Sequence, residues 1–161
     1  MKKIILFYFI FNVFGFVYSQ DAGTNVSGNE LAEVKKFIKD FKSNFSSLTS
    51  STSTNYIKFP LKLENGTFNM ELVNTWTEMS NNIKEEIKSF CTKIPDNIEL
   101  DKNYEEQGYN LKMTYESDKQ SYKIIINFDD DDWTSEEFWI KKINNKFLLV
   151  EFCIYSLMDM F

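Results

Sequence analysis

Four consecutive aspartates, Asp129, Asp130, Asp131 and Asp132, are the densest group of possible metal ligands in this sequence. Ca²⁺ takes about six to eight oxygen ligands, so clustered carboxylates are candidates for binding it. Consecutive residues in a tight turn point in different directions, however, and the run lacks the spacing of a calcium-binding loop. We therefore interpret it as the acidic tip of a hairpin, which discourages edge pairing. A Ca²⁺-binding module is the alternative.

The chain has two thiols, Cys91 and Cys153. An even number of cysteines in an exported protein favours a disulfide. Spacing alone leaves two alternatives open, a Cys91–Cys153 bridge and two buried free thiols. A catalytic cysteine is not expected, because the sequence contains no histidine to activate it.

Five aromatic residues are candidates for lining a ligand pocket: Trp76, Tyr109, Tyr115, Tyr122 and Trp139. A carboxylate buried among them would have a raised pKa and could act as a general base. The nearest acids, Glu137 and Glu151, lie on predicted strands of mixed pattern and not on a clean apolar face. We favour the interpretation that these aromatics are core residues, and no catalytic residue can be assigned.

Composition excludes several mechanisms. The chain has no histidine, and each of its 18 basic residues is lysine. A Ser-His-Asp triad, a histidine metal site and a bidentate guanidinium clamp are therefore absent. The net charge of -6 argues against a nucleic-acid partner, because phosphate binding needs clustered positive charge. No cofactor is expected.

The N-terminus has the pattern of a secretory signal peptide. Lys2 and Lys3 precede an apolar run from Ile4 to Tyr18, which is shorter than the roughly 20 residues of a membrane-spanning helix. Cleavage after Ser19 would leave a periplasmic or extracellular soluble protein without a stable membrane anchor. We expect a signal peptide over 1–19, a disordered leader over 20–29 and a single domain over 30–161.

The hydrophobic pattern predicts two helices and six strands. One helix begins at Glu30 and ends before the Ser/Thr-rich run 46–55, and a second extends from Asn74 or Thr75 to Phe90. Pro60 indicates that the strand at 56–63 is an edge strand or a strand-like lead-in. The polar stretch 94–107 is expected to be a loop. The remaining expected strands are 67–73, 109–115, 121–128, 134–143 and 146–155.

This order predicts an α+β fold in which helices pack on one face of a curved antiparallel sheet that ends in a β-meander. If Asn144 and Asn145 form a two-residue turn, Val150 lies opposite Trp139 and Leu149 opposite Ile140. Both faces of the last hairpin would then be apolar, which is unusual for a sheet with one solvated face. One expected face carries Trp139, Ile143, Leu148, Val150, Phe152 and Ile154. The other carries Phe138, Ile140, Phe147, Leu149, Cys153 and Tyr155. Either the chain itself covers the second face, or the 134–155 hairpin contacts a second copy or another protein.

The order of elements and the segment from Phe138 to Leu149, which includes WIKKINNKFLL, resemble the NTF2-like (cystatin-like) α+β superfamily. The stretch YIKFPLKL resembles a segment of uncharacterised exported proteins of Gram-negative bacteria. The early strand pair at 56–73 departs from the usual superfamily order. The resemblance implies a cone-shaped domain with a pocket and is compatible with a dimer, but it implies no particular reaction.

The leading expectation is an exported, non-catalytic binding or interaction domain. Its partner would be a protein, a second copy, or a small apolar ligand. The alternatives are a small-molecule cavity enzyme, isomerase- or hydratase-like, that uses a carboxylate and Tyr, and the Ca²⁺-binding module. Whether the protein is an enzyme is undecided by sequence, with a non-enzymatic role favoured.

Overall fold

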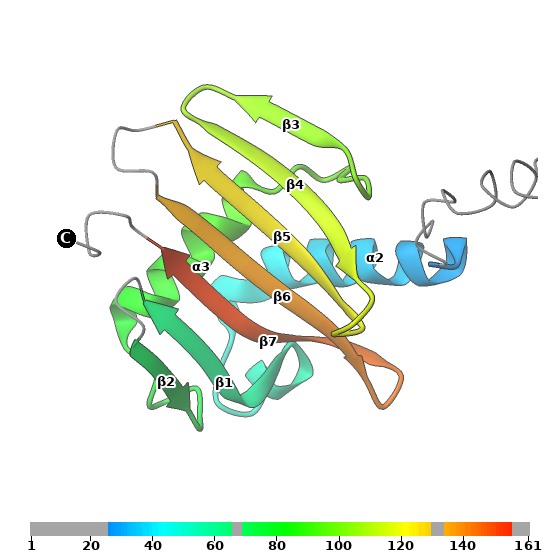
Figure 1. Ribbon diagram of the computed structural model, residues 1–161. Coiled ribbons are helices and arrows are strands. Elements are labelled where there is room, and N and C mark those ends of the chain that lie inside the picture. The colour runs from blue at the N-terminus through cyan, green and yellow to red at the C-terminus, as the bar shows by residue number, and fades with distance from the viewer. Residues whose placement is uncertain (1–25, 66–68, 130–133, 156–161) are drawn as a thin grey trace, which may run out of the picture.

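The computed structural model describes residues 26–65, 69–129 and 134–155 (Figure 1). The predicted signal peptide, most of the predicted leader and Asp130 to Asp132 lie outside these residues. In chain order the elements are α2 (Gly28–Asn44), η1 (Phe45–Ser47), η2 (Ser53–Asn55), β1 (Ile57–Asn65), β2 (Asn69–Val73), α3 (Asn81–Lys93), β3 (Asn103–Glu106), β4 (Tyr109–Glu116), β5 (Ser121–Phe128), β6 (Ser135–Ile143) and β7 (Lys146–Tyr155).

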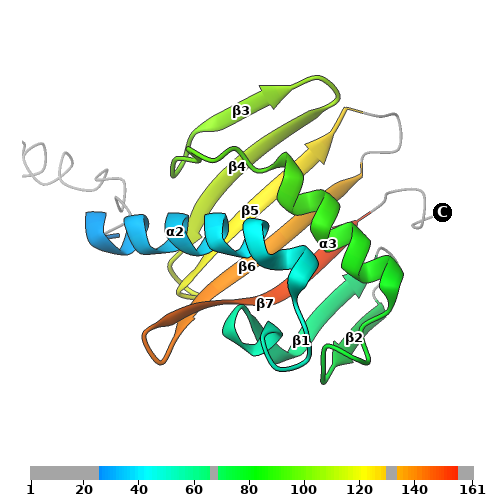
Figure 2. The same ribbon diagram turned by 180° about the vertical axis from the view of Figure 1, so that it is seen from behind.

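The seven strands form one curved sheet in the order β2-β1-β7-β6-β5-β4-β3. All neighbouring strands are antiparallel except β1 and β7, which are parallel. Both helices cross the same face of the sheet, and Figure 2 shows them in front of it. The α+β arrangement predicted from the sequence is therefore confirmed, but the sheet is mixed and not antiparallel throughout, because β1 and β7 are parallel. We call the other face, which no helix of the described residues covers, the open face.

Each helix begins at a serine cap. The Ser27 hydroxyl accepts a hydrogen bond from the Glu30 amide (3.2 Å), and the Ser80 hydroxyl accepts one from the Ile83 amide (3.2 Å). A capping serine satisfies amide groups that have no partner in the first helical turn. The cap at Ser80 starts α3 several residues later than the sequence pattern predicted.

Aromatic side chains join the helices to the sheet. Phe138 of β6 lies 4.8 Å from Phe90 of α3 and 5.8 Å from Phe41 of α2, measured between ring centroids. Phe152 of β7 contacts Phe138 and Phe90 edge-on. All four rings are buried, so this cluster forms the centre of the core.

A bulge in the last hairpin corrects the predicted faces. Asn144 and Asn145 adopt positive φ and form the expected turn, and Ile140 pairs with Leu149 as predicted. Trp139, however, pairs with Glu151, so Val150 is an extra residue in β7. A one-residue shift exchanges the two sides of a strand. Beyond the bulge, buried Phe152 therefore joins the helix-covered core, and the opposite side of β7 carries Glu151, Cys153 and Tyr155.

Two further expectations need correction. The stretch 94–107, predicted to be a loop, contains β3, an edge strand on which only Tyr104 is half-buried. β1 is not an edge strand, since it lies between β2 and β7. Pro60 is accommodated because it falls where the register between β1 and β7 shifts, before the pairing of β1 with β2 begins at Leu61.

Candidate functional site

The open face holds a cluster of charged groups on β1 and β7, the second and third strands from the β2 edge. The parallel register places Lys62 beside Glu151 and Glu64 beside Cys153. The Lys62 ammonium contacts Glu151 Oε1 at 2.6 Å and Glu64 Oε2 at 3.1 Å. The three side chains are 32%, 20% and 25% exposed for Lys62, Glu151 and Glu64 respectively. These ion pairs are therefore less screened by water than pairs at a fully exposed surface.

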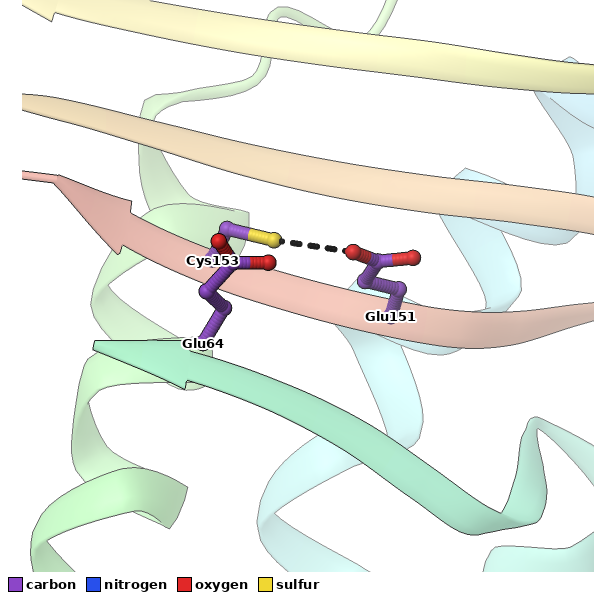
Figure 3. A group of neighbouring side chains, drawn as sticks. All are labelled: Glu64, Glu151 and Cys153. Carbon is purple, nitrogen blue, oxygen red and sulfur yellow. Dashed lines mark hydrogen bonds between the residues drawn. The ribbon is translucent and has the colours of Figure 1, made fainter. Parts of the chain in front are cut away.

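The Cys153 thiol belongs to the same cluster. It is fully buried and donates a hydrogen bond to Glu151 Oε1 at 3.3 Å (Figure 3). Burial raises the pKa of this thiol to about 12, and the neighbouring carboxylates of Glu151 and Glu64 add to that effect. A protonated thiol is a poor nucleophile and a poor metal ligand. Cys153 is thus not set up as a reactive cysteine.

Glu64, Glu151 and Cys153 are also the group of side chains that could hold a metal ion in the described chain, since their ligand atoms lie within 4.8 Å of one another. Two carboxylates and a sulfur would suit a transition metal such as zinc. The Lys62 ammonium, however, already contacts both carboxylates. A metal would have to displace this lysine and remove the thiol proton.

A second cluster on the open face surrounds Trp139. Its indole nitrogen donates to Glu137 Oε2 at 2.9 Å, and the ammonium of Lys119 lies 3.8 Å from the ring centroid. Lys123 contacts Glu137 at 3.6 Å and also lies near the ring. Trp139 is only 6% exposed as a result. The polar groups and the indole at the centre of the open face are therefore satisfied by the chain itself.

The margin of the open face differs from its centre. Met70 and Leu72 of β2 are 61% and 54% exposed, and they are the large apolar side chains that stay exposed in the described chain. They lie beside Glu64 and Lys62 in the register of β1 and β2. β2 is an edge strand, and its outer edge pairs with no strand of the described residues. An exposed apolar edge of this kind marks either an interaction site or a risk of aggregation.

Next to this edge lies a small hollow of about 190 Å³ between the β1–β2 pair, β7 and α3. Its apolar lining includes Leu63, Ile83 and Phe152, and its two carboxylates are Glu64 and Glu71. Small-molecule sites usually start at roughly 300 Å³. This hollow is therefore of a size for a single side chain.

The aromatic residues predicted to line a pocket do not converge. Tyr115 and Tyr122 meet edge-on, with centroids 5.0 Å apart. Tyr109 packs on Phe128, Trp76 packs on Phe45, and Trp139 lies on the open face. None of the five lines the hollow beside β2 or the two other hollows described for this chain, of about 510 and 390 Å³ beside the β6–β7 turn. Tyr122 is buried and donates to Glu30 (3.2 Å), and burial raises its pKa.

The structure also describes the two cysteines and one residue of the aspartate run. Both thiols are free: Cys91 lies on α3 in the core, and Cys153 lies on the open face, across the sheet from it. Of the aspartate run, Asp129 is described, and it accepts a hydrogen bond from Asn110 at 3.0 Å. The Ca²⁺ prediction rests on residues outside the described chain and stays a prediction.

Sequence reasoning missed Glu86 of α3. Its Oε2 is buried and has no hydrogen-bond partner among the described residues. Burial raises the pKa of Glu86, and the nearby Glu136 carboxylate raises it further. Glu136 is paired with Lys93 at 3.1 Å. Glu86 lies in a helix among charged neighbours in sequence, and such a position gives no signal of burial. The Lys62 cluster was missed for a different reason, because Lys62 and Glu151 are distant in sequence.

No family model and no curated protein matches this sequence. Among solved structures, an NTF2-like protein from Cytophaga hutchinsonii is 8% identical, with 81% of this chain and 99% of that chain covered and a TM-score of 0.38. A protein of unknown function with a cystatin-like fold from Nostoc punctiforme is 10% identical, with 81% and 93% covered and a TM-score of 0.34. An uncharacterised cystatin-like protein from Caulobacter vibrioides is 8% identical, with 80% and 90% covered and a TM-score of 0.35.

These three proteins are described as NTF2-like or cystatin-like, the superfamily that the sequence resembles. At these identities and TM-scores the similarity supports no statement about ligand, activity or partner.

Proposed function

We propose that this chain is an exported, non-catalytic binding domain whose partner is another protein. The observation that carries the proposal is the exposure of Met70 and Leu72 side by side on the edge strand β2. Large apolar side chains gathered at an exposed edge are typical of a surface that another chain covers. The 190 Å³ hollow beside them adds a site for one side chain of that partner.

The state of the reactive groups favours binding over catalysis. The Cys153 thiol is held protonated against Glu151, and the Tyr122 hydroxyl donates to Glu30. Glu64 and Glu151 are neutralised in part by Lys62. An acid–base catalyst needs a titratable group poised near the working pH beside space for a substrate. These groups are instead engaged with one another.

Export is part of the proposal and rests on the basic and apolar pattern before Ser19. In the described residues no helix is long and apolar enough to cross a membrane. The test is N-terminal sequencing of the chain expressed from Met1 in bacteria. A mature protein that begins at Gln20 supports export, and an intact N-terminus in the cytoplasmic fraction contradicts it.

A crosslinking experiment tests the binding function. A photo-reactive amino acid replaces Leu72 in the exported chain, and the matched control carries it at Thr114, which lies on the open face of β4. We expect an adduct of defined mass from position 72 and none from position 114. Adducts from neither position, or from both equally, would contradict a partner site at β2.

A second copy of the chain is the alternative partner, through the 134–155 hairpin. The solution mass of the exported chain across a wide concentration range distinguishes the two. A dimer that persists when Met70 and Leu72 are both replaced by Thr would move the interface to the hairpin. A monomer throughout would leave a different protein as the partner.

A cavity enzyme is the second candidate function, and Glu86 is the observation that favours it. A half-buried carboxylate with one buried, unpartnered oxygen and a raised pKa is the kind of group that such an enzyme uses as a base. The three hollows described here do not include Glu86 in their linings. A structure of the chain soaked with small carbonyl compounds tests this candidate: density beside Glu86 would support it, and its absence would count against it.

A further inference from the structure

The two edges of the sheet differ in chemistry. At one edge, β3 has the sequence NYEE, and its glutamates Glu105 and Glu106 are exposed. Charged residues on an edge strand discourage pairing with another chain. At the other edge, β2 exposes Met70 and Leu72 and contains neither lysine nor proline. β2 carries one exposed charge, Glu71, where β3 carries two, and it leaves Met70 and Leu72 exposed, so β2 is the less protected edge.

Side chains of β2 alternate between the two faces of the sheet, and this alternation determines which side chains a strand added beside β2 would contact. Met70 and Leu72 pair with Glu64 and Lys62 on the open face, and Glu71 pairs with Leu63 on the helix-covered face. Glu71 is exposed and makes no ion pair within the described chain. None of the described residues that line the hollow of about 190 Å³ beside Glu71 is basic. A side chain placed beside Glu71 would therefore meet an apolar wall and an unneutralised carboxylate.

Pairing of β2 with β2 of a second copy would leave the charge of Glu71 unneutralised. An antiparallel pair of two β2 strands that uses the whole strand places Glu71 opposite Glu71 of the second copy. Like charges that lie directly opposite each other destabilise a strand pair. A cationic side chain at the same position would instead neutralise Glu71, and its apolar stem could lie in the hollow. Charge complementarity favours a different protein over a second copy.

We propose that β2 is a docking edge for an extended segment of a partner protein with the pattern apolar–basic–apolar. The segment adds a strand to β2, so that backbone hydrogen bonds supply affinity and alternate side chains supply specificity. Its lysine or arginine lies beside Glu71 and enters the hollow, and its two flanking apolar residues cover Met70 and Leu72. This inference rests on the proposed protein-binding function and names the class of partner.

The test uses two synthetic peptides, TVTVKVTVT and TVTVEVTVT, which differ in the central charge alone. Each is titrated into the isotope-labelled chain, expressed from Met1 and purified as the cell processes it, and followed by NMR amide shifts. We expect the lysine peptide to shift the amides of 70–73 and to bind roughly fivefold more tightly than the glutamate peptide, the effect of one ion pair. Glu71→Lys should reverse this preference.

Glu105→Lys, on the opposite edge, is the matched control and should leave both affinities unchanged. Met70→Thr with Leu72→Thr should weaken both peptides, while the amide spectrum shows that the fold is kept. Shifts confined to other strands, or a preference that Glu71→Lys does not alter, would overturn the docking mode. If crosslinking from position 72 still yields a partner in that case, the binding function stands and only this mode fails.

Discussion

Replacing Lys62 by methionine should destabilise the protein, because Lys62 neutralises two carboxylates at once. Its ammonium lies 2.6 Å from Glu151 and 3.1 Å from Glu64. Methionine keeps most of the apolar stem but leaves the two carboxylates side by side on adjacent strands. The variant therefore removes attraction and adds repulsion.

The size of the loss follows from burial. Exposed ion pairs contribute about 0–1 kcal/mol, and breaking a fully buried pair costs about 3–5 kcal/mol. The side chains of this cluster are 20% to 32% exposed, so we expect a loss of about 2 kcal/mol at neutral pH. The hydrogen bond to Glu151 and the other interactions with the two carboxylates raise the pKa of Lys62. A lysine with a raised pKa contributes its full stability below its ordinary value of 10.5.

The assay is urea unfolding of the wild type and of Lys62→Met. The free energies of unfolding are compared, and the slope of their dependence on urea concentration should be the same for both proteins. The loss should shrink as the pH falls toward about 4, since protonating one carboxylate relieves the repulsion. Lys112→Met is the control, because Lys112 lies on the same face and makes no ion pair in the described chain. A double-mutant cycle with Glu151→Gln should give a coupling of about 1–2 kcal/mol. A coupling near zero, or a loss independent of pH, would refute the reasoning.

Three further predictions follow from buried groups. Glu86→Gln should stabilise the protein by about 1 kcal/mol at neutral pH, because it removes the charge of a half-buried carboxylate whose Oε2 has no partner among the described residues. The pKa of Glu86 in the folded protein is raised above its ordinary value of 4.5. The wild type therefore loses stability as the pH rises above about 4.5, and unfolding curves should show that the stability gained by Glu86→Gln vanishes below about pH 4. Phe138→Ala should cost about 3–5 kcal/mol in the same assay, and Phe138→Leu clearly less. Cys91 and Cys153 should resist a thiol reagent in the folded protein and react fully in denaturant; rapid reaction of either in the folded state would contradict their burial.

Residues that obey a regular period were predictable from sequence. The apolar face of α2, the alternation of β4 and β5 and the Asn144–Asn145 turn each repeat a local rule that the structure keeps. β3 was not predictable, because both of its sides are largely exposed and it carries no alternation. The start of α3 was misplaced because Trp76 and Met79 continue the helical spacing, although the cap at Ser80 begins the helix after them.

The candidate site was less predictable, because it depends on where one strand breaks its alternation. Val150 is apolar and lies within an apolar run, so nothing in the sequence marks it as the extra residue. Its insertion turns Phe152 into the core and brings Glu151 and Cys153 out beside Lys62 and Glu64. The same shift replaces a predicted apolar surface on the last hairpin with a set of satisfied ion pairs.

The bulge therefore also changes where a partner is to be sought. Lysine and glutamate are depleted at the centres of protein interfaces, because desolvating them is costly. The centre of the open face is built from such residues, and Trp139 among them is covered. Among the described residues, the large apolar side chains that remain exposed are Met70 and Leu72 of β2, which flank Glu71, a carboxylate without an ion pair in this part of the chain. Binding at this margin costs no ion pair of the cluster, which is why β2 is the better candidate than the hairpin that the sequence favoured.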